Sequence, residues 1–235
     1  MKIVYNVNIL MVTTAWNDVR DLTRKIRLRI GFNTTQTWKN APAIFDAQTL
    51  KILGHPVMEG WETPYMKVLA GIATRNSGVI LEVGYGMGIS GRFIQQANIT
   101  KHIIIEANHD VAEKARAFAN TSPNPVEILE GLWDEVIDAI PDDSLDGILF
   151  DTYPLSEDEI HTNHFKFFPT AFKKLKIGGV FTYYSDEITD FSAKHRRLLL
   201  ESGFSNIGKK VVEVQPSVGC QYWKSSSIIA PVVTK

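Results

Sequence analysis

From about residue 79 onward, short apolar segments alternate with amphipathic segments long enough to form helices. The apolar segments read VILEVGYG, HIIIEAN, VEILEG, DGILFDTY and GGVFTYYS. Segments this apolar are typical of parallel strands that are buried on both faces of a sheet. The alternation predicts successive strand-helix-strand units. We expect helices over residues 89–97, 113–119, 165–175 and 193–202, the third of them capped by Gly178 and Gly179.

The last two apolar segments, IGKKVVEVQP and YWKSSSIIAPVV, follow each other without room for a crossover helix. Parallel neighbours need such a crossover, so these two strands are expected to pair antiparallel. The chain is therefore predicted to be an α/β protein with a seven-stranded, mostly parallel sheet and a C-terminal antiparallel strand pair.

Composition limits the classes of partner and location. The 235 residues are 44% hydrophobic, enough to bury one α/β core, and the formal net charge is -1. A charge near zero argues against a nucleic acid or a membrane surface as partner and favours a small molecule. Cys220 is the only cysteine and no apolar run reaches membrane-spanning length, so we expect a cytoplasmic protein. A homo-oligomer stays open.

The N-terminal part of the chain has a different character. Its segment VRDLTRKIRLRI is basic, and residues 1–37 are expected to form an extension to a single domain over residues 38–235. A solvated helix face explains this segment more simply than contact with an acidic partner, and both interpretations stay open.

The stretch GILFDTYPLS places a carboxylate, Asp151, at the end of a buried strand, two residues before Tyr153. In an open doubly wound sheet, ligands bind beyond the carboxyl ends of the strands, near the point where strand order reverses. A desolvated carboxylate needs a partner at such a place. A helix N-cap or a structural salt bridge would provide one, but the position favours a functional role for Asp151.

A glycine-rich turn, EVGYGMG, follows the first predicted strand. Glu106 ends the next strand, where an acid can bind ribose hydroxyls, so the two features together indicate a nucleoside cofactor. A dinucleotide fingerprint would need a third glycine at the position of Ile89. Glu82, ahead of Gly84, suits a ligand with an ammonium group in place of a phosphate.

These features resemble the class I methyltransferases, which are Rossmann-like and use S-adenosylmethionine. Longer segments are similar to the guanidinoacetate N-methyltransferase family, namely LKILGHPVMEGWETPYM, LEVGYGMGIS, EGLWDEV, DGILFDTYPLSEDEIHTNHF and IIAPVVTK. The resemblance runs from about Trp38 to the C-terminus and leaves residues 1 to about 33 unassigned. It implies methyl transfer from S-adenosylmethionine to a guanidino nitrogen of a small molecule, with S-adenosylhomocysteine as product and no metal.

The resemblance also implies roles for individual residues. Asp151 and Glu62 match two carboxylates that hold the substrate guanidine, and Tyr153 lines the same pocket. Other residues match the cofactor site. Those that fold over the cofactor are Trp38, Met58 and Met66, and those that form the turn beneath its methionine portion are Tyr85, Gly86, Met87, Gly88, Ile89 and Ser90. The ribose site is matched by Glu106, Ala107 and Asn108, and the adenine site by Trp133 and Asp134.

The expected chemistry of the two carboxylates follows from the guanidinium group. Its planar, paired N–H donors suit bidentate carboxylates, but as a cation it is a poor nucleophile. A carboxylate must accept a proton as the new bond to carbon forms, and we assign this role to Asp151, with Glu62 orienting the other nitrogens. Two alternatives stay open: a nucleotide-dependent oxidoreductase, and a non-catalytic cofactor-binding protein whose basic segment contacts a protein partner.

One stretch departs from the family. After the fifth predicted strand, the family offers backbone amides in an Asn-Leu-Thr context to the substrate carboxylate, whereas this chain has Ser185, Asp186 and Glu187. Gly60 also stands where the family usually has Arg. Two acids would repel a bound carboxylate, which favours an acceptor with an amine, such as arginine or agmatine. Guanidinoacetate held by the amides, with both acids facing solvent, is an equal alternative.

His161 and His164 lie near three acids and invite comparison with a metal site. Metal-binding helices more often present histidines at i, i+4, so capping or surface hydrogen bonding is the favoured interpretation. Ser156 is expected to cap a helix, with Glu159 at its third position.

Overall fold

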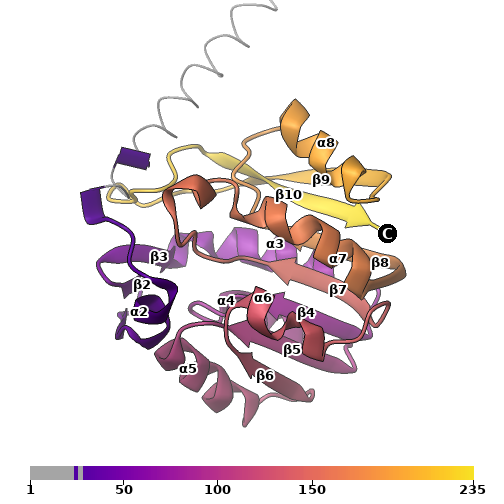
Figure 1. Ribbon diagram of the computed structural model, residues 1–235, viewed down its shortest axis with the longest axis horizontal. Coiled ribbons are helices and arrows are strands. Elements are labelled where there is room, and N and C mark those ends of the chain that lie inside the picture. The colour runs from indigo at the N-terminus through magenta and orange to yellow at the C-terminus, as the bar shows by residue number, and fades with distance from the viewer. Residues whose placement is uncertain (1–23, 26–28) are drawn as a thin grey trace, which may run out of the picture.

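The computed structural model describes residues 24–25 and 29–235 of the protein, and its centre is a seven-stranded sheet (Figure 1). The strand order is β6-β5-β4-β7-β8-β10-β9. The strands span Val79–Val83 (β4), Lys101–Glu106 (β5), Val126–Glu130 (β6), Leu145–Phe150 (β7), Leu175–Tyr183 (β8), Asn206–Glu213 (β9) and Ser227–Thr234 (β10).

The strands from β4 to β8 are parallel, while β10 pairs antiparallel with both β8 and β9. The predicted sheet, with its C-terminal antiparallel pair, is confirmed. Strand order reverses at β4, which lies between β5 and β7. The carboxyl ends of β4 and β7 therefore border the crevice in which open α/β sheets bind ligands.

Helices cover both faces of the sheet. They are Thr63–Ala73 (α3), Ile89–Gln95 (α4), His109–Ala119 (α5), Trp133–Val136 (α6), Phe168–Lys174 (α7) and Ala193–Glu201 (α8). Side chains alternate along the strands between two buried clusters, so that Ile80 and Leu149 join one cluster while Leu81 and Phe150 join the other. Burial on both faces explains why these segments are almost wholly apolar.

Gly178 and Gly179 do not cap a helix, which corrects the sequence-based expectation. Helix α7 ends at Lys174, and the next residue already begins β8, which contains both glycines. The Gly178 N–H donates to the Lys235 carbonyl at 2.8 Å, and the Lys235 N–H donates to the Gly179 carbonyl at 3.1 Å. The C-terminus therefore occupies the backbone groups that a helix cap would have used.

Elements that the sequence pattern did not predict precede the large sheet. Helix α2 (Thr35–Asn40) is followed by a three-stranded antiparallel sheet of β1 (Ala43–Phe45), β2 (Thr49–Ile52) and β3 (His55–Glu59), and by the 3-10 helix η1 (Gly60–Glu62). The β2–β3 hairpin turns at Leu53 and Gly54, whose φ angles of 51° and 81° suit a two-residue turn. Figure 1 shows these elements grouped at one end of the large sheet.

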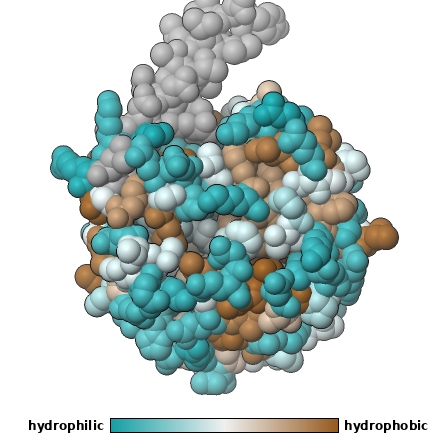
Figure 2. Space-filling view, viewed as in Figure 1, coloured by the Kyte–Doolittle hydropathy of each residue, from teal (hydrophilic) through white to brown (hydrophobic). Residues whose placement is uncertain are grey.

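Much of the predicted basic extension, residues 1–23 and 26–28, lies outside the described residues. Within the described chain, no helix is both long and apolar enough to cross a membrane. On the face shown in Figure 2, hydrophilic residues predominate and hydrophobic residues are interspersed among them.

Candidate active site

A cavity opens where β4, β5 and β7 end, and α2, β3 and the chain before β10 complete its walls. The predicted site residues that line it are Trp38, Met58, Glu62, Gly84, Gly86, Glu106, Ala107, Trp133, Asp134, Asp151, Tyr153 and Asp186. The fold therefore brings the two predicted catalytic carboxylates and much of the predicted cofactor site to a single cavity.

The turn after β4 touches the end of β7. The Asp151 N–H donates to the Val83 carbonyl at 2.9 Å, and a Cβ on Gly84 would lie 1.9 Å from the Asp151 carbonyl oxygen. Gly84 also has a φ of +89°, which residues with side chains rarely adopt. Glycine is required at this contact, and the contact places Asp151 directly beside the turn.

Glu106 organises the same turn from the end of β5. Its Oε2 accepts from the Tyr85 N–H at 2.8 Å and its Oε1 accepts from the Asn108 N–H at 2.9 Å. Burial raises the pKa of Glu106, and the surrounding backbone N–H groups oppose that rise. Glu106 also lines the cavity, where its carboxylate is an acceptor next to the space for a ligand.

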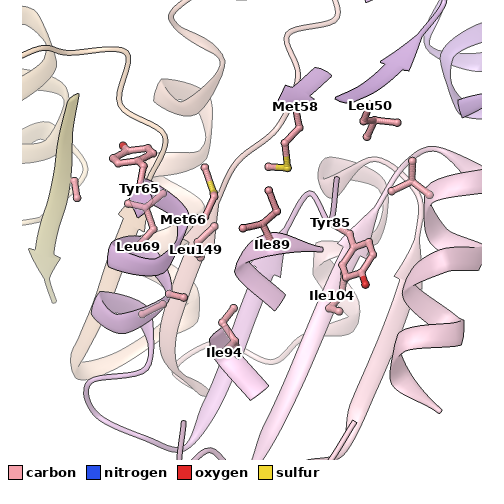
Figure 3. Packing of buried hydrophobic residues seen from close by; sticks show 14 of the residues in the cluster. Leu50, Met58, Tyr65, Met66, Leu69, Tyr85, Ile89, Ile94, Ile104 and Leu149 are labelled. Atoms are coloured by element: carbon pink, nitrogen blue, oxygen red, sulfur yellow. The ribbon is translucent and has the colours of Figure 1, made fainter. Parts of the chain in front are cut away.

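Several residues predicted to contact the cofactor do not line the cavity. They are Met66, Glu82, Tyr85, Met87, Gly88, Ile89, Ser90 and Asn108. Figure 3 shows Met66, Tyr85 and Ile89 among core side chains, and each is at most 6% exposed. Met66 packs in the core on the buried face of α3, and its contact with the cofactor stays a prediction. Met87 of the same turn is partly exposed, and the cofactor contacts of these residues stay predictions.

Glu82 lies in the core of the fold. It is fully buried in β4, where the Ser90 hydroxyl donates to its Oε1 and His102 Nε2 lies 3.0 Å from its Oε2. These contacts hold α4 against β4 and β5. The carboxylate therefore supports the glycine turn from inside the fold and does not present itself to an ammonium group in the cavity.

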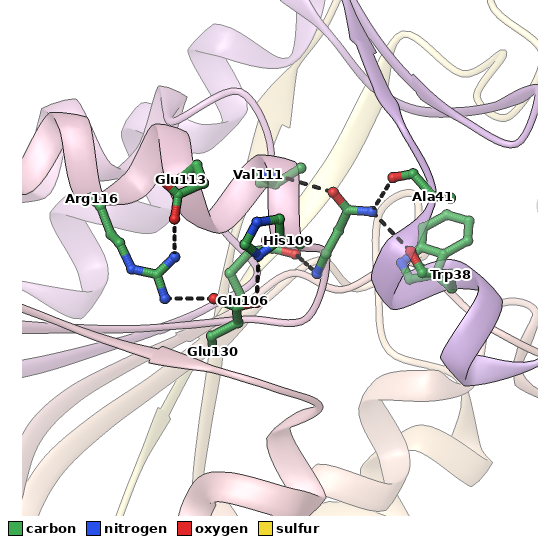
Figure 4. A network of polar contacts seen from close by, with 9 residues as sticks. Trp38, Ala41, Glu106, His109, Val111, Glu113, Arg116 and Glu130 are labelled. Atoms are coloured by element: carbon green, nitrogen blue, oxygen red, sulfur yellow. Dashed lines mark hydrogen bonds and ion pairs between the residues drawn. The ribbon is translucent and has the colours of Figure 1, made fainter.

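Asn108 binds protein groups where a ribose contact was predicted. Its Oδ1 caps α5 by accepting from the Val111 N–H at 3.2 Å, and its Nδ2 donates to the carbonyls of Trp38 and Ala41, each at 2.8 Å (Figure 4). The side chain is committed to these three bonds. Asn108 therefore anchors the end of α2 beside the cavity.

The predicted adenine site lies at the start of α6. Trp133 packs edge-on against Phe150 and Phe167, with ring centroids 6.3 and 5.1 Å apart. Asp134 is exposed at the cavity wall. The core beneath the indole fixes its position, so this corner offers an apolar ring and a hydrogen-bond acceptor.

Glu62 reaches the cavity from η1 and is 2% exposed. Its Oε1 accepts from the Tyr222 hydroxyl at 2.6 Å and from the Glu59 N–H at 2.7 Å. The Glu59 side chain accepts in turn from the Ser217 hydroxyl at 3.0 Å. The chain between β9 and β10 thus holds in place a carboxylate that comes from the N-terminal half.

Glu62 and Asp151 are electrostatically coupled. Burial and, next, the Asp151 carboxylate raise the pKa of Glu62 to about 8, against hydrogen bonds that lower it. Burial raises the pKa of Asp151 to about 7, with further contributions from Asp186 and Glu82. Among the described residues, the charged groups that raise these two pKa values are all carboxylates. A cation placed between the two would lower both pKa values.

Asp186 and Glu187 face different surroundings. Asp186 lines the cavity, and its Oδ1 lies 3.0 Å from His161 Nδ1. Both residues of this ion pair have positive φ angles, 53° and 62°, a strained conformation that concentrates at functional sites. Glu187 is 6% exposed and accepts from the Ser192 N–H at 3.1 Å, where α8 begins. Asp186 thus lies in the cavity wall and the Glu187 carboxylate contacts the start of α8, while a substrate role for either residue stays a prediction.

An aromatic group forms another wall of the cavity. The rings of Trp38 and Tyr153 stack with centroids 4.9 Å apart and 12° between their planes. The Tyr153 hydroxyl lies 2.9 Å from His55 Nδ1, and His55 Nε2 lies 2.9 Å from the Gly31 carbonyl oxygen. Helix α2, strand β3 and the segment after β7 meet through these rings.

His164 is buried in the structure and does not lie at the surface, where hydrogen bonding was expected of it. His164 is 1% exposed and stacks on Tyr183 at 5.2 Å. Among the described residues, no group of three or more His, Cys, Asp or Glu side chains could hold a metal ion.

Ser156 precedes the 3-10 helix η3 (Glu157–Glu159) but makes no side-chain cap bond. Glu159 accepts instead from the Leu155 N–H at 3.0 Å.

A family model described as guanidinoacetate N-methyltransferase matches residues 27–235. The chain belongs to the guanidinoacetate N-methyltransferase family. The resemblance carried by the sequence motifs is thereby confirmed, and the family match begins ahead of the predicted domain start at residue 38.

Relatives of this family member include fungal proteins named protein arginine N-methyltransferase 2. The protein of Eremothecium gossypii is 32% identical over 136 residues, which cover 55% of this chain and 32% of the relative. That of Kluyveromyces lactis is 33% identical over 147 residues, which cover 60% of this chain and 35% of the relative. The matched part therefore spans about a third of the length of these relatives.

Solved structures share the fold of this family member at low sequence identity. A spermidine synthase in complex with the transition state analogue AdoDATO has a TM-score of 0.58 and 16% identity, covering 82% of this chain and 72% of that chain. M. jannaschii TYW2 in complex with AdoMet has a TM-score of 0.52 and 14% identity, covering 83% and 85%. These similarities show the class I, Rossmann-like fold.

Three residues of the site were not predicted from the sequence: His55, His161 as the partner of Asp186, and Tyr222. Tyr222 lies far from Glu62 in the chain, at the start of the segment YWKSSSIIAPVV, whose pattern predicted a strand and no site residue. His55 stands inside the family-like segment LKILGHPVMEGWETPYM, so its position next to the site was foreseeable, although its contacts were not.

The raised pKa values predict how stability depends on pH. Both carboxyls hold protons more tightly when folded, so the stability they provide is present at acid pH and lost as pH rises through about 7 and 8. Asp151→Asn removes one of these acids and a like charge beside Glu62. We expect the variant without ligands to be ~1–2 kcal/mol more stable than the wild type at pH 8, with a smaller difference at pH 5.

Urea unfolding at several pH values measures this difference. Asp138→Asn, at an exposed position of the 3-10 helix Ile137–Ala139, is the matched control and should follow the wild type. An Asp151→Asn variant that is equally destabilised at both pH values would contradict the effect of the Asp151 charge on the pKa of Glu62.

Proposed function

We propose that this protein transfers a methyl group from S-adenosylmethionine to a nitrogen of a guanidino group. The supporting observation is that Glu62 and Asp151, two carboxylates of raised pKa, line one cavity. Like charges in such a place are unfavourable without a cationic ligand. A guanidinium is such a ligand, and its paired N–H donors match carboxylate oxygens.

The cavity also suits the methyl donor. Gly84 and Gly86 leave the backbone without side chains next to Glu106, an acceptor suited to ribose hydroxyls, and Trp133 and Asp134 suit a nucleobase. S-adenosylmethionine supplies an electrophilic methyl group on a sulfonium when bound. Membership in a methyltransferase family supports this donor, as does the shared fold of a protein crystallised with AdoMet.

The protein's own contribution is to hold the guanidine and to remove its proton. Asp151, with a pKa near neutrality, is suited to accept a proton from the attacking nitrogen as that nitrogen becomes bonded to carbon. Glu62, whose Oε1 is fixed by Tyr222 and Glu59, is suited to orient the remaining N–H groups. Positioning of this kind can provide several kcal/mol of the acceleration.

Asp151→Asn tests this assignment. It keeps the size of the side chain but removes the base, so kcat should fall by about 10²–10⁴ while binding of S-adenosylhomocysteine is retained. Glu62→Gln should raise the KM for the guanidine. Methyl transfer from a radiolabelled donor and calorimetric titration measure the two effects, and Glu201→Gln, exposed on α8, is the control.

Unchanged turnover in Asp151→Asn would contradict the base assignment. Thermal stabilisation by NAD and not by S-adenosylmethionine would favour the oxidoreductase alternative. Binding of S-adenosylhomocysteine by a wild-type protein that methylates none of several guanidines would favour the non-catalytic alternative.

We further propose that the acceptor is the guanidino group of an arginine, with the arginine side chain of a polypeptide as the main candidate. Asp186 adds a third carboxylate to the cavity wall and is among the groups that raise the pKa of Asp151. Guanidinoacetate carries a carboxylate close to its guanidine, and this charge would meet Asp186. The names of the fungal relatives, protein arginine N-methyltransferase 2, agree with this choice.

A panel of acceptors distinguishes these substrates. An arginine-containing peptide, arginine and agmatine should each exceed guanidinoacetate in kcat/KM by about tenfold or more, because like-charge juxtaposition costs on the order of a few kcal/mol. Asp186→Asn should improve guanidinoacetate relative to the others. Asp190→Asn removes an exposed charge four residues away as control. Preference of the wild type for guanidinoacetate would overturn the acceptor assignment.

A further inference from the structure

His55 lies outside the catalytic carboxylate pair and yet is 2% exposed beside the cavity wall. It begins β3, and its ring is surrounded by aromatic neighbours. Phe32, Trp38 and Tyr153 have ring centroids 6.0, 6.1 and 5.4 Å from it. Trp38 and Tyr153 line the cavity, so His55 lies directly behind two of its wall residues.

The two ring nitrogens of His55 have different partners. Nε2 lies 2.9 Å from the Gly31 carbonyl oxygen, and a carbonyl only accepts, so Nε2 carries a hydrogen and donates. In the neutral ring, Nδ1 then has a free lone pair. The Tyr153 hydroxyl, 2.9 Å away, donates to it. The Gly31 backbone thereby selects the tautomer that fixes the direction of the Tyr153 hydroxyl.

This pair of bonds joins three parts of the chain. Gly31 precedes α2 and Trp38 lies within it, His55 belongs to β3, and Tyr153 follows β7 two residues after Asp151. Trp38 stacks on Tyr153 in near-parallel orientation. The hydrogen bonds of His55 add to this packing in holding the segment preceding α2 and the Tyr153 ring against each other.

We propose that His55 is a positioning residue for the methyl acceptor. It orients Tyr153 and, through Gly31 and Trp38, fixes residues 31–38 as a wall of the cavity next to Asp151. The identity of the ligand in this proposal rests on the proposed function. The hydrogen-bonded connection itself rests on the contacts of His55.

Substitutions at His55 can separate its two hydrogen bonds. The side chain of His55→Asn can place an oxygen near the site of Nδ1 and so accept from Tyr153. That of His55→Gln can place its amide nitrogen near the site of Nε2 and so donate to Gly31. His55→Leu removes both bonds, and Tyr153→Phe removes one bond from the other side.

The experiment is a double-mutant cycle of His55→Leu and Tyr153→Phe in the full chain. Its readouts are KM and kcat with an arginine-containing peptide, the Kd of S-adenosylhomocysteine, and stability in urea. We expect each single substitution to raise KM about tenfold with a much smaller effect on kcat, and the double variant to resemble His55→Leu, because partners in one hydrogen bond are not additive. His55→Asn should restore KM better than His55→Gln.

Additive effects in the double variant, or an unchanged KM in His55→Leu with intact stability, would overturn the positioning role. Equal rescue by the Asn and Gln variants would overturn the separate roles of the two nitrogens. If the wild type binds S-adenosylhomocysteine but shows no turnover, the proposed function fails. The double-mutant cycle can then be measured on the Kd of S-adenosylhomocysteine, which still tests the hydrogen bond between His55 and Tyr153.

Discussion

The structure depends on two carboxylates, Glu62 and Asp151, that line one cavity and have raised pKa values, that of Glu62 in part because of the Asp151 charge. The fold contributes a further acid, Asp186, to the same wall. Such an arrangement is costly in an empty protein and becomes favourable when a cation lies between the acids. The surrounding contacts hold these groups in place for a cationic ligand.

Those contacts come from segments far apart in the chain. The contact of Gly84 with the Asp151 backbone fixes one acid at the reversal point of the sheet. The other acid depends on η1 and on Tyr222, which reaches it from the chain between β9 and β10. The small N-terminal sheet lies across the same end, where His55 connects it to Tyr153. Neither half of the chain could build this cavity alone.

The sequence predicted the large sheet because parallel strands buried on both faces leave a strong apolar signal, and the family motifs pointed to Glu62, Asp151, Glu106 and Tyr153. It did not predict β1 to β3, since these strands of three, four and five residues are too short to show a clear apolar pattern. Motif matching also assigned Met66 and Glu187 to the site, and the structure shows both side chains buried in contacts with the protein. A motif gives the position of a residue along the chain, but the direction of its side chain depends on tertiary packing.

Proton release on guanidinium binding tests the central claim most directly. With S-adenosylhomocysteine present, an arginine-containing peptide can be titrated at pH 7.5 in two buffers of different ionisation enthalpy. If the cation lowers the raised pKa values of Glu62 and Asp151, binding should release a proton, and the observed heat should differ between the buffers accordingly. Binding without proton release, or with proton uptake, would contradict the account.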